Sequence, residues 1–249
     1  GAPLVLPLSE EVGAALIETY IRSLEPTKPG DTARVVALTR EMIAAARDAL
    51  PKESIELADR LTQLGDGLRA LNVLDEAELL LREALTLSEK LRATDHPKTL
   101  QTKNCLAVTC YWLKKLDKSV PMFEELLKVR VASLGRQHPD TVMNLLNLGI
   151  NYADSGRNEE AIPLLEEARQ GLKTDPSKGS VNAVLLESYR KVHDLKNPRD
   201  KARVVALLTA IFADVRRQLA QRSLAPATEL AQLGQTPVDD TRAPLCLQR

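Results

Sequence analysis

The sequence predicts an all-α protein, a right-handed α-solenoid superhelix built from stacked antiparallel helix pairs. Three observations support this prediction. Parts of the chain recur with a constant period of 42 residues, and apolar residues inside each copy recur at three- and four-residue spacing. Aromatic residues make up only 3% of a chain that is rich in Leu and Ala. This composition favours helices that pack through small and unbranched aliphatic side chains.

The period is clearest between two segments that align without a gap. "DHPKT" begins at Asp95 and "QHPDT" at Gln137, so His96 and His138 occupy equivalent positions. A third copy precedes them, and the positions shared by all three copies hold apolar or small residues: Leu64, Leu106 and Leu148; Gly65, Ala107 and Gly149; Ala77, Ser119 and Ala161. Three copies at a constant period predict a repeat array.

Each copy is predicted to form two helices. In the clearest copy, residues 139–154 have apolar residues on one helical face. The sequence "DSGRN" then ends the helix, with Gly156 in the left-handed conformation that suits a helix C-terminus. Asn158 is predicted to cap the second helix, and in an earlier copy Asp75 and Glu78 resemble a capping box. We expect Gly65 and Gly149 to permit close contact between the two helices of a pair.

The chain also contains a duplication that is longer than this 42-residue period. The hexapeptide "ARVVAL" occurs at residues 33–38 and 202–207, within an alignment of residues 12–65 with residues 181–234 that has 22 identities in 54 positions. A unit of four helix pairs is therefore itself duplicated. We predict a helical lead-in at 1–30, a repeat array at 31–220, and a partial repeat start with a disordered tail at 221–249, where Pro237 and Pro244 oppose a helix.

Composition excludes several classes of protein. Lys plus Arg and Asp plus Glu both total 34, so a nucleic-acid partner is not expected. No apolar run reaches the length of a membrane span, and we predict a cytoplasmic protein without a membrane partner. Cys105 and Cys110 fit no zinc spacing and are predicted to be buried, whereas Cys246 lies near the end of the chain.

The positions Leu148, Gly149, Tyr152, Gly156 and Ala161 resemble the tetratricopeptide repeat. The 42-residue period and the wording "HPDT…GRNEEAIPLLEEA" resemble the kinesin-light-chain variety of that repeat. The unit of four helix pairs is also similar to arrays in large bacterial multidomain proteins, planctomycete ones especially, which often accompany a serine/threonine kinase domain.

No catalytic, cofactor or metal site can be argued from the residues. His96 and His138 could lie near one another on a solenoid, but the repeat explains both without a metal ion. His193 has no nearby Cys or His. No Ser/His/Asp or Cys/His arrangement and no kinase motif is present. We predict that the chain is not an enzyme and needs no cofactor.

The resemblance implies a concave groove that binds a peptide or helix, lined by the first helix of each pair. The implied groove residues are Asp59, Thr62, Asp66, Arg69, Gln101, Asn104, Val108, Tyr111, Met143, Leu146, Ile150 and Asp154. For Val108, Leu146 and Ile150, simple packing is an equal alternative. With Arg69 as the only basic neighbour of Asp59 and Asp66, we expect one end of the groove to be acidic and the other apolar.

The predicted function is that of a scaffold or adaptor that binds another protein. The alternative is a non-catalytic regulatory segment of a larger signalling enzyme such as a serine/threonine kinase. The residues do not identify the partner or the oligomeric state.

Overall fold

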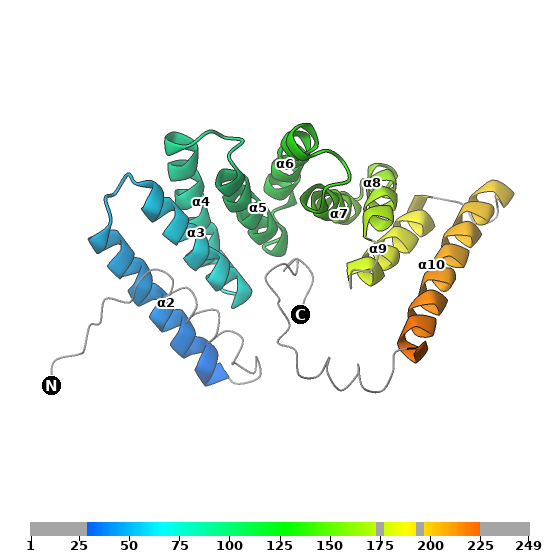
Figure 1. Cartoon of the computed structure of the whole chain (residues 1–249), viewed down its shortest axis with the longest axis horizontal. Helices are drawn as coiled ribbons and strands as arrows, with labels where there is room; N and C mark the ends of the chain where they lie inside the picture. Colours follow the sequence, from blue (N-terminus) through cyan, green and yellow to red (C-terminus); the bar gives the residue numbers. More distant parts are fainter. Residues whose placement is uncertain (1–28, 173–176, 193–196, 225–249) are drawn as a thin grey trace. The chain divides into compact units, whose positions relative to one another are not determined.

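A computed structural model describes residues 29–172, 177–192 and 197–224, and the regular structure of these ranges is entirely α-helical. The helices follow one another along the chain as shown in Figure 1: α2 (Pro29–Ala49), α3 (Ile55–Ala70), α4 (Leu74–Leu91), α5 (Pro97–Trp112), α6 (Leu116–Leu134), α7 (Pro139–Asp154), α8 (Asn158–Gly171), α9 (Ser177–Val192) and α10 (Pro198–Leu224). The helix predicted at 139–154 has the bounds of α7. Most of the predicted lead-in and the predicted tail beyond 224 lie outside the described residues.

The chain divides into two compact units, residues 1–129 and residues 130–249, with the boundary inside α6. In unit 1, α3 packs against α2, α4 and α5. In unit 2, α7 packs against α8 and α9, and α9 also contacts α10. Within each unit, helices that follow one another in sequence are therefore neighbours in space, as the helix-pair prediction requires. None of the described helices is long and apolar enough to cross a membrane.

The core of unit 1 forms where the apolar faces of α3, α4 and α5 meet. Its centre contains Leu61, Leu81 and Leu106, all with less than 2% of their surface exposed. Cys105 and Cys110 belong to the same cluster and are buried, which confirms the prediction for both. Burial raises the pKa of the Cys110 thiol, so this sulfur stays protonated and acts as a small apolar group.

Two glycines allow the helices of a pair to approach closely. A Cβ atom placed on Gly65 would lie 2.8 Å from Cγ of Leu81, and one placed on Gly149 would lie 2.7 Å from Cγ of Leu165. Both distances are far below the separation of about 3.5–4.0 Å at which carbon atoms attract one another. The prediction of close contact at Gly65 and Gly149 is thus confirmed for α3 with α4 and for α7 with α8.

The first helix of each pair ends in the same backbone turn. Gly156 has a φ angle of 83°, which confirms the predicted left-handed conformation, and the equivalent residues Asn72 and Lys114 have φ angles of 62° and 60°. The N–H of the following residue donates to a carbonyl five residues back, as in the bond from Arg157 to Tyr152. This is the Schellman pattern that satisfies the last carbonyls of a helix.

The predicted caps of the second helices are wrong. Arg157 is the N-cap of α8, and Asn158 is already inside the helix, where its amide nitrogen donates to the Gly156 carbonyl at 3.1 Å. Val73 is the N-cap of α4 and has no capping side chain, so Asp75 and Glu78 do not form a capping box. In both cases the residue that completes the preceding turn is also the N-cap of the next helix, and its side chain makes no capping hydrogen bond.

The two repeat histidines cap the first helices of their pairs instead. Nδ1 of His96 accepts the N–H of Lys98, and Nδ1 of His138 accepts the N–H of Asp140, both at 3.2 Å. Each histidine precedes a proline, which biases its backbone towards the extended conformation that an N-cap adopts. The local backbone therefore accounts for the His-Pro pair in both repeats.

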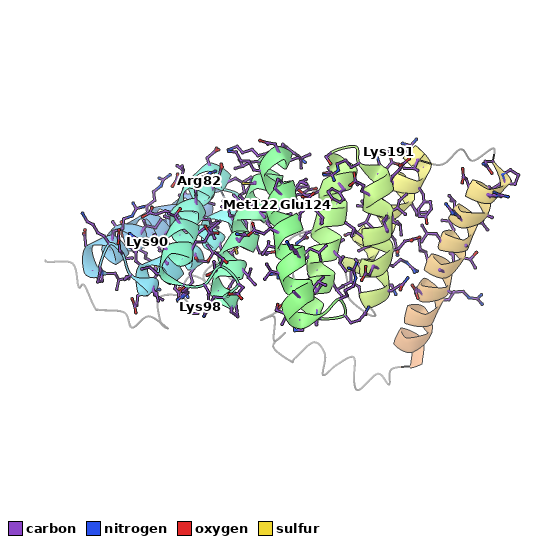
Figure 2. The ribbon with its side chains drawn as sticks, turned by 90° about the horizontal axis from the view of Figure 1, so that it is seen from above. Arg82, Lys90, Lys98, Met122, Glu124 and Lys191 are labelled. Carbon is purple, nitrogen blue, oxygen red and sulfur yellow. The ribbon has the colours of Figure 1, made fainter. Side chains whose placement is uncertain are left out.

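Ionic contacts join successive repeats in unit 1. The Glu78 side chain on α4 is only 8% exposed and accepts from Arg82, which Figure 2 labels, and from Lys115 beyond the end of α5. Nζ of Lys103 on α5 lies 3.1 Å from Glu89 on α4 and 2.8 Å from Glu125 on α6. The equivalent residues Leu61 and Leu145 are fully buried leucines, so Lys103 places a charge at an otherwise apolar position of the repeat.

Candidate peptide-binding surface

In unit 1 the predicted groove residues lie on two helices that touch, α3 and α5. Their contact includes a buried hydrogen bond between the hydroxyl oxygens of Thr62 and Thr102, which are 2.8 Å apart. Thr62 is 7% exposed. This predicted groove residue therefore joins the two helices and offers little surface to a ligand.

Asp59 forms an ion-pair network that the sequence did not indicate. Its carboxylate accepts from Arg92 at 2.5 and 2.8 Å and from Nζ of Lys98 at 2.5 Å. Partial burial of Asp59 opposes its charge, but the hydrogen bonds from Arg92 and Lys98 outweigh this effect and lower the pKa of the carboxyl. The expectation that Arg69 is the only basic neighbour is therefore wrong.

Asp66 is also neutralised. Its Oδ1 accepts from Nε and Nη2 of Arg69 at 2.8 Å, and the Arg69 side chain is only 7% exposed. Each aspartate that was expected to make an acidic end of the groove has a cationic partner at hydrogen-bonding distance. The α3 surface of unit 1 therefore lacks the unpaired negative charge that the sequence suggested.

The α5 surface presents amide and aromatic groups. Gln101 is exposed, Asn104 and Tyr111 are half-buried, and Val108 is buried with 4% of its surface exposed. The Tyr111 ring meets the ring of Trp112 edge to face at 5.4 Å. The ammonium of Lys114 lies over the Tyr111 ring, 5.2 Å from the ring centroid, which is within the range of a cation–π contact.

Unit 2 contributes the remaining predicted groove residues, all on α7. Met143 is half-buried and Asp154 is exposed at the end of the helix, whereas Leu146 and Ile150 are buried with 0% and 5% of their surface exposed. Val108, Leu146 and Ile150 thus have the burial that the packing alternative expects. Of the apolar residues that were predicted to contact a ligand, Met143 keeps an exposed surface.

Sequence reasoning missed several polar features of these helices. α7 has three buried asparagines, Asn144, Asn147 and Asn151, on neighbouring turns, and the Asn151 amide donates to the Asn147 carbonyl at 2.8 Å. Their spacing of three and four residues can be read in the sequence, but the sequence does not indicate that all three are buried. Trp112, the only tryptophan of the chain, was also missed, although it directly follows Tyr111.

The described residues contain no group of three His, Cys, Asp or Glu side chains that could hold a metal ion. His96 and His138 both use Nδ1 for a helix cap, as described above. The accessible groups described above include the amides of Gln101 and Asn104, the Tyr111 ring and the paired charges of Asp59 and Asp66. Such groups suit recognition of a polypeptide, which offers hydrogen-bonding backbone groups and side chains of many kinds.

Family comparisons agree with this arrangement. One family model, described as the tetratricopeptide repeat, matches residues 57–98, and a second with the same description matches residues 98–174. Residues 57–174 consist of tetratricopeptide repeats. Repeats of this family generally mediate contacts between proteins. The matched segment contains the twelve predicted groove residues.

Solved structures confirm the solenoid fold of these tetratricopeptide repeats. One is a Podosopora anserina protein described as a kinesin light chain with nearly identical TPR-like repeats, with a TM-score of 0.67 and 20% identity over 83% of this chain and 94% of the other. Another is BtubC (BKLC) from P. vanneervenii, with a TM-score of 0.66 and 22% identity over 86% of this chain and 84% of the other. At this level of identity the similarity establishes the fold alone.

Curated relatives extend far beyond the matched region. A clustered mitochondria protein homolog of Emericella nidulans is 25% identical over 140 residues, which cover 56% of this chain and 11% of the relative. A homolog in Aspergillus oryzae is 24% identical over 153 residues, which cover 59% of this chain and 12% of the relative. These matches do not support the predicted bacterial multidomain origin or the alternative of a segment that regulates a kinase.

Proposed function

We propose that the chain is a non-catalytic adaptor that binds a segment of another protein, as an extended peptide or a helix, along the first helices of its tetratricopeptide repeats. In unit 1 the binding helices are α3 and α5, and in unit 2 the binding helix is α7. The observation that supports this proposal most directly is the α5 surface, where Gln101, Asn104 and Tyr111 remain accessible beside the fixed α3.

The chemistry of this surface suits a polypeptide. Amide side chains can donate to and accept from the main chain of a bound segment, and Tyr and Trp supply large contact areas at a low cost in conformational entropy. Because Asp59 and Asp66 are already paired with cations, their carboxylates are held in place and are not expected to bind a basic group of the ligand. The expected ligand therefore needs an apolar or aromatic anchor near Tyr111, together with groups that form hydrogen bonds to amides. It does not need a basic end.

The test is a comparison of two charge-matched variants of the full chain. The first, Gln101→Arg with Asn104→Arg, changes α5. The second, Leu79→Arg with Thr86→Arg, adds the same charge to exposed positions two turns apart on α4. A binding partner is first captured with the wild-type chain and identified by mass spectrometry, and its affinity for each purified variant is then measured by calorimetry.

We expect the α5 variant to bind at least about tenfold more weakly, since central contacts dominate an interface, and the α4 variant to match the wild type. Loss of binding in the α4 variant with full binding in the α5 variant would refute the proposed surface. Changing Asp59 to Lys is not a suitable probe, because it would also remove the ion pairs of Asp59 with Arg92 and Lys98.

A further inference from the structure

Helix α10 of unit 2 has an inner face that an ion-pair network holds in place. The Asp214 carboxylate lies 2.7 Å from Arg169 on α8 and 3.0 Å from Lys178 on α9. Leu207 and Ile211 precede Asp214 by seven and three residues, so they lie on the same side of the helix, and both are half-buried. This side of α10 is therefore the one turned towards the rest of unit 2.

The opposite side of α10, which we call the outer face, carries an exposed apolar stripe. Val205, Leu208 and Phe212 are 51%, 36% and 65% exposed, and their spacing of three and four residues aligns them along the helix. The other phenylalanine of the chain, Phe123, is 1% exposed. An exposed apolar stripe that includes an aromatic ring is typical of a surface that a partner covers.

The outer face of α10 is more apolar than the equivalent face of α2, although that face of α2 lies against a core. In the duplication described above, Leu208 and Phe212 correspond to Thr39 and Ile43. Thr39 is 1% exposed, and Ile43 packs against the core cluster of unit 1. Since exposure to water alone would favour the more polar residue, the larger apolar side chains on α10 indicate that this face binds something.

A cation lies at each end of the apolar stripe. Lys201 precedes Val205 by four residues and Arg216 follows Phe212 by four residues, so both share the outer face. Both side chains are exposed. They are fifteen residues apart, which is about 22 Å along the helix axis. The outer face thus consists of Lys201, Val205, Leu208, Phe212 and Arg216, with positive charge on both sides of an apolar centre.

We propose that this outer face binds a segment of another protein with acidic residues at both ends of a short apolar run. Aliphatic or aromatic anchors of the segment pack on Phe212 and its neighbours, and the acidic residues pair with Lys201 and Arg216. Because complementary charge at both ends fixes how a segment lies on the helix, it supplies specificity as well as attraction. This surface is separate from the proposed binding surface on α3, α5 and α7.

Charge argues against a second copy of the chain as the occupant. If two copies of α10 met through their outer faces in antiparallel fashion, Lys201 of one copy would lie against Arg216 of the other. In a parallel arrangement each cation would lie against its own equivalent. Like charges would meet in either arrangement, which disfavours self-association.

The structure of unit 2 also favours a polypeptide over a membrane surface. A helix that lies on a membrane presents a broad apolar face to the lipid and a basic face to water. The side of α10 opposite the stripe instead faces the rest of unit 2, where Asp214 binds Arg169 and Lys178. The exposed stripe consists of three apolar side chains, which suits the anchors of a peptide better than insertion into lipid.

Selection from a random peptide library displayed on phage tests the proposal. The full wild-type chain is the bait, after depletion of the library on the full chain with Phe212→Asp. Phe212 is largely exposed, so this change should leave the fold intact, which circular dichroism checks. We expect the enriched peptides to be acidic and to contain aliphatic or aromatic anchors between the acidic residues.

The affinity of these peptides for charge-matched variants is then measured by fluorescence anisotropy. Lys201→Gln with Arg216→Gln should weaken binding about tenfold and reduce its dependence on salt. Arg199→Gln with Arg203→Gln removes the same charge from exposed positions of α10 that lie off the outer face, and it should bind like the wild type.

Three outcomes would overturn the proposal. The first is a selection without acidic peptides that depend on Phe212, or peptides that bind both charge variants equally. The second is a wild-type chain that sediments as a dimer while Phe212→Asp sediments as a monomer, which would identify a second copy as the occupant. The third is Phe212-dependent binding to vesicles of phosphatidylserine and phosphatidylcholine in the absence of such peptides, which would identify a membrane surface.

Discussion

The close approach of α7 and α8 at Gly149 makes a sharp prediction about packing. Replacing a glycine inside a helix by alanine normally stabilises a protein by up to about 1 kcal/mol, because alanine has the higher helix propensity. At Gly149 the new Cβ would lie 2.7 and 2.8 Å from two carbon atoms of Leu165. Leu165 is 0% exposed, so its side chain has no solvent into which it could move.

The magnitude follows from these distances. Restoring an ordinary contact of about 3.5 Å requires the two helices to separate by most of an ångström, and overpacking of this kind costs about 1–3 kcal/mol. The gain in helix propensity offsets only part of that cost. We therefore expect Gly149→Ala to lower the free energy of unfolding by about 1 kcal/mol and Gly149→Leu by about 1–3 kcal/mol.

Gly179 provides a matched control in the same unit. It lies in α9, and a Cβ atom placed there would meet nothing within 4 Å, so Gly179→Ala should be neutral or stabilising. Thermal unfolding followed by circular dichroism would show a lower midpoint for Gly149→Ala and an equal or higher one for Gly179→Ala. If both variants melted at or above the wild-type temperature, the close contact between α7 and α8 would be refuted.

Three further perturbations test individual contacts. Glu78→Gln should cost about 2 kcal/mol at pH 7, because it removes charged hydrogen bonds to Arg82 and Lys115. Burial opposes the Glu78 charge, but these hydrogen bonds outweigh it and lower the pKa of the Glu78 carboxyl. The stabilisation is therefore present above the unfolded pKa of about 4.3 and is lost as pH falls through the folded pKa. If the stability of the wild type and of Glu78→Gln changed with acid pH in the same way, this reasoning would be contradicted. Gly156→Ala should destabilise unit 2 by about 1 kcal/mol, measured by urea unfolding, since φ is 83° there. His138→Ala should cost about 1 kcal/mol and His138→Asn much less in the same assay, because only the latter keeps a capping acceptor.

The helices could be predicted because their signals are local. The period of 42 residues located equivalent positions, and the spacing of apolar residues inside residues 139–154 defined the bounds of α7. The close contacts of Gly65 and Gly149 were predictable for the same reason, since both glycines occupy one repeat position that faces a large residue of the paired helix.

The surface charge could not be predicted in this way. Arg92 and Lys98 are 33 and 39 residues from Asp59 in sequence, and only the path of the chain after α4 brings them to it. Burial at groove positions such as Leu146 likewise depends on how successive helices stack. The repeat pattern identifies which residues share a position, but it does not reveal which of them the neighbouring repeats cover.

The ionic contacts of Lys103 and Glu78 give unit 1 a property that an array with only apolar interfaces lacks. In a linear repeat array the stability of the whole is set by the stability of each repeat and by the coupling between neighbours. In unit 1 part of that coupling passes through Lys103 on α5, which binds Glu89 on the preceding helix and Glu125 on the following one. Salt and acid weaken charge pairs but leave apolar contacts largely intact. Ionic conditions therefore adjust how cooperatively the repeats of unit 1 unfold, while each helix pair keeps its own core.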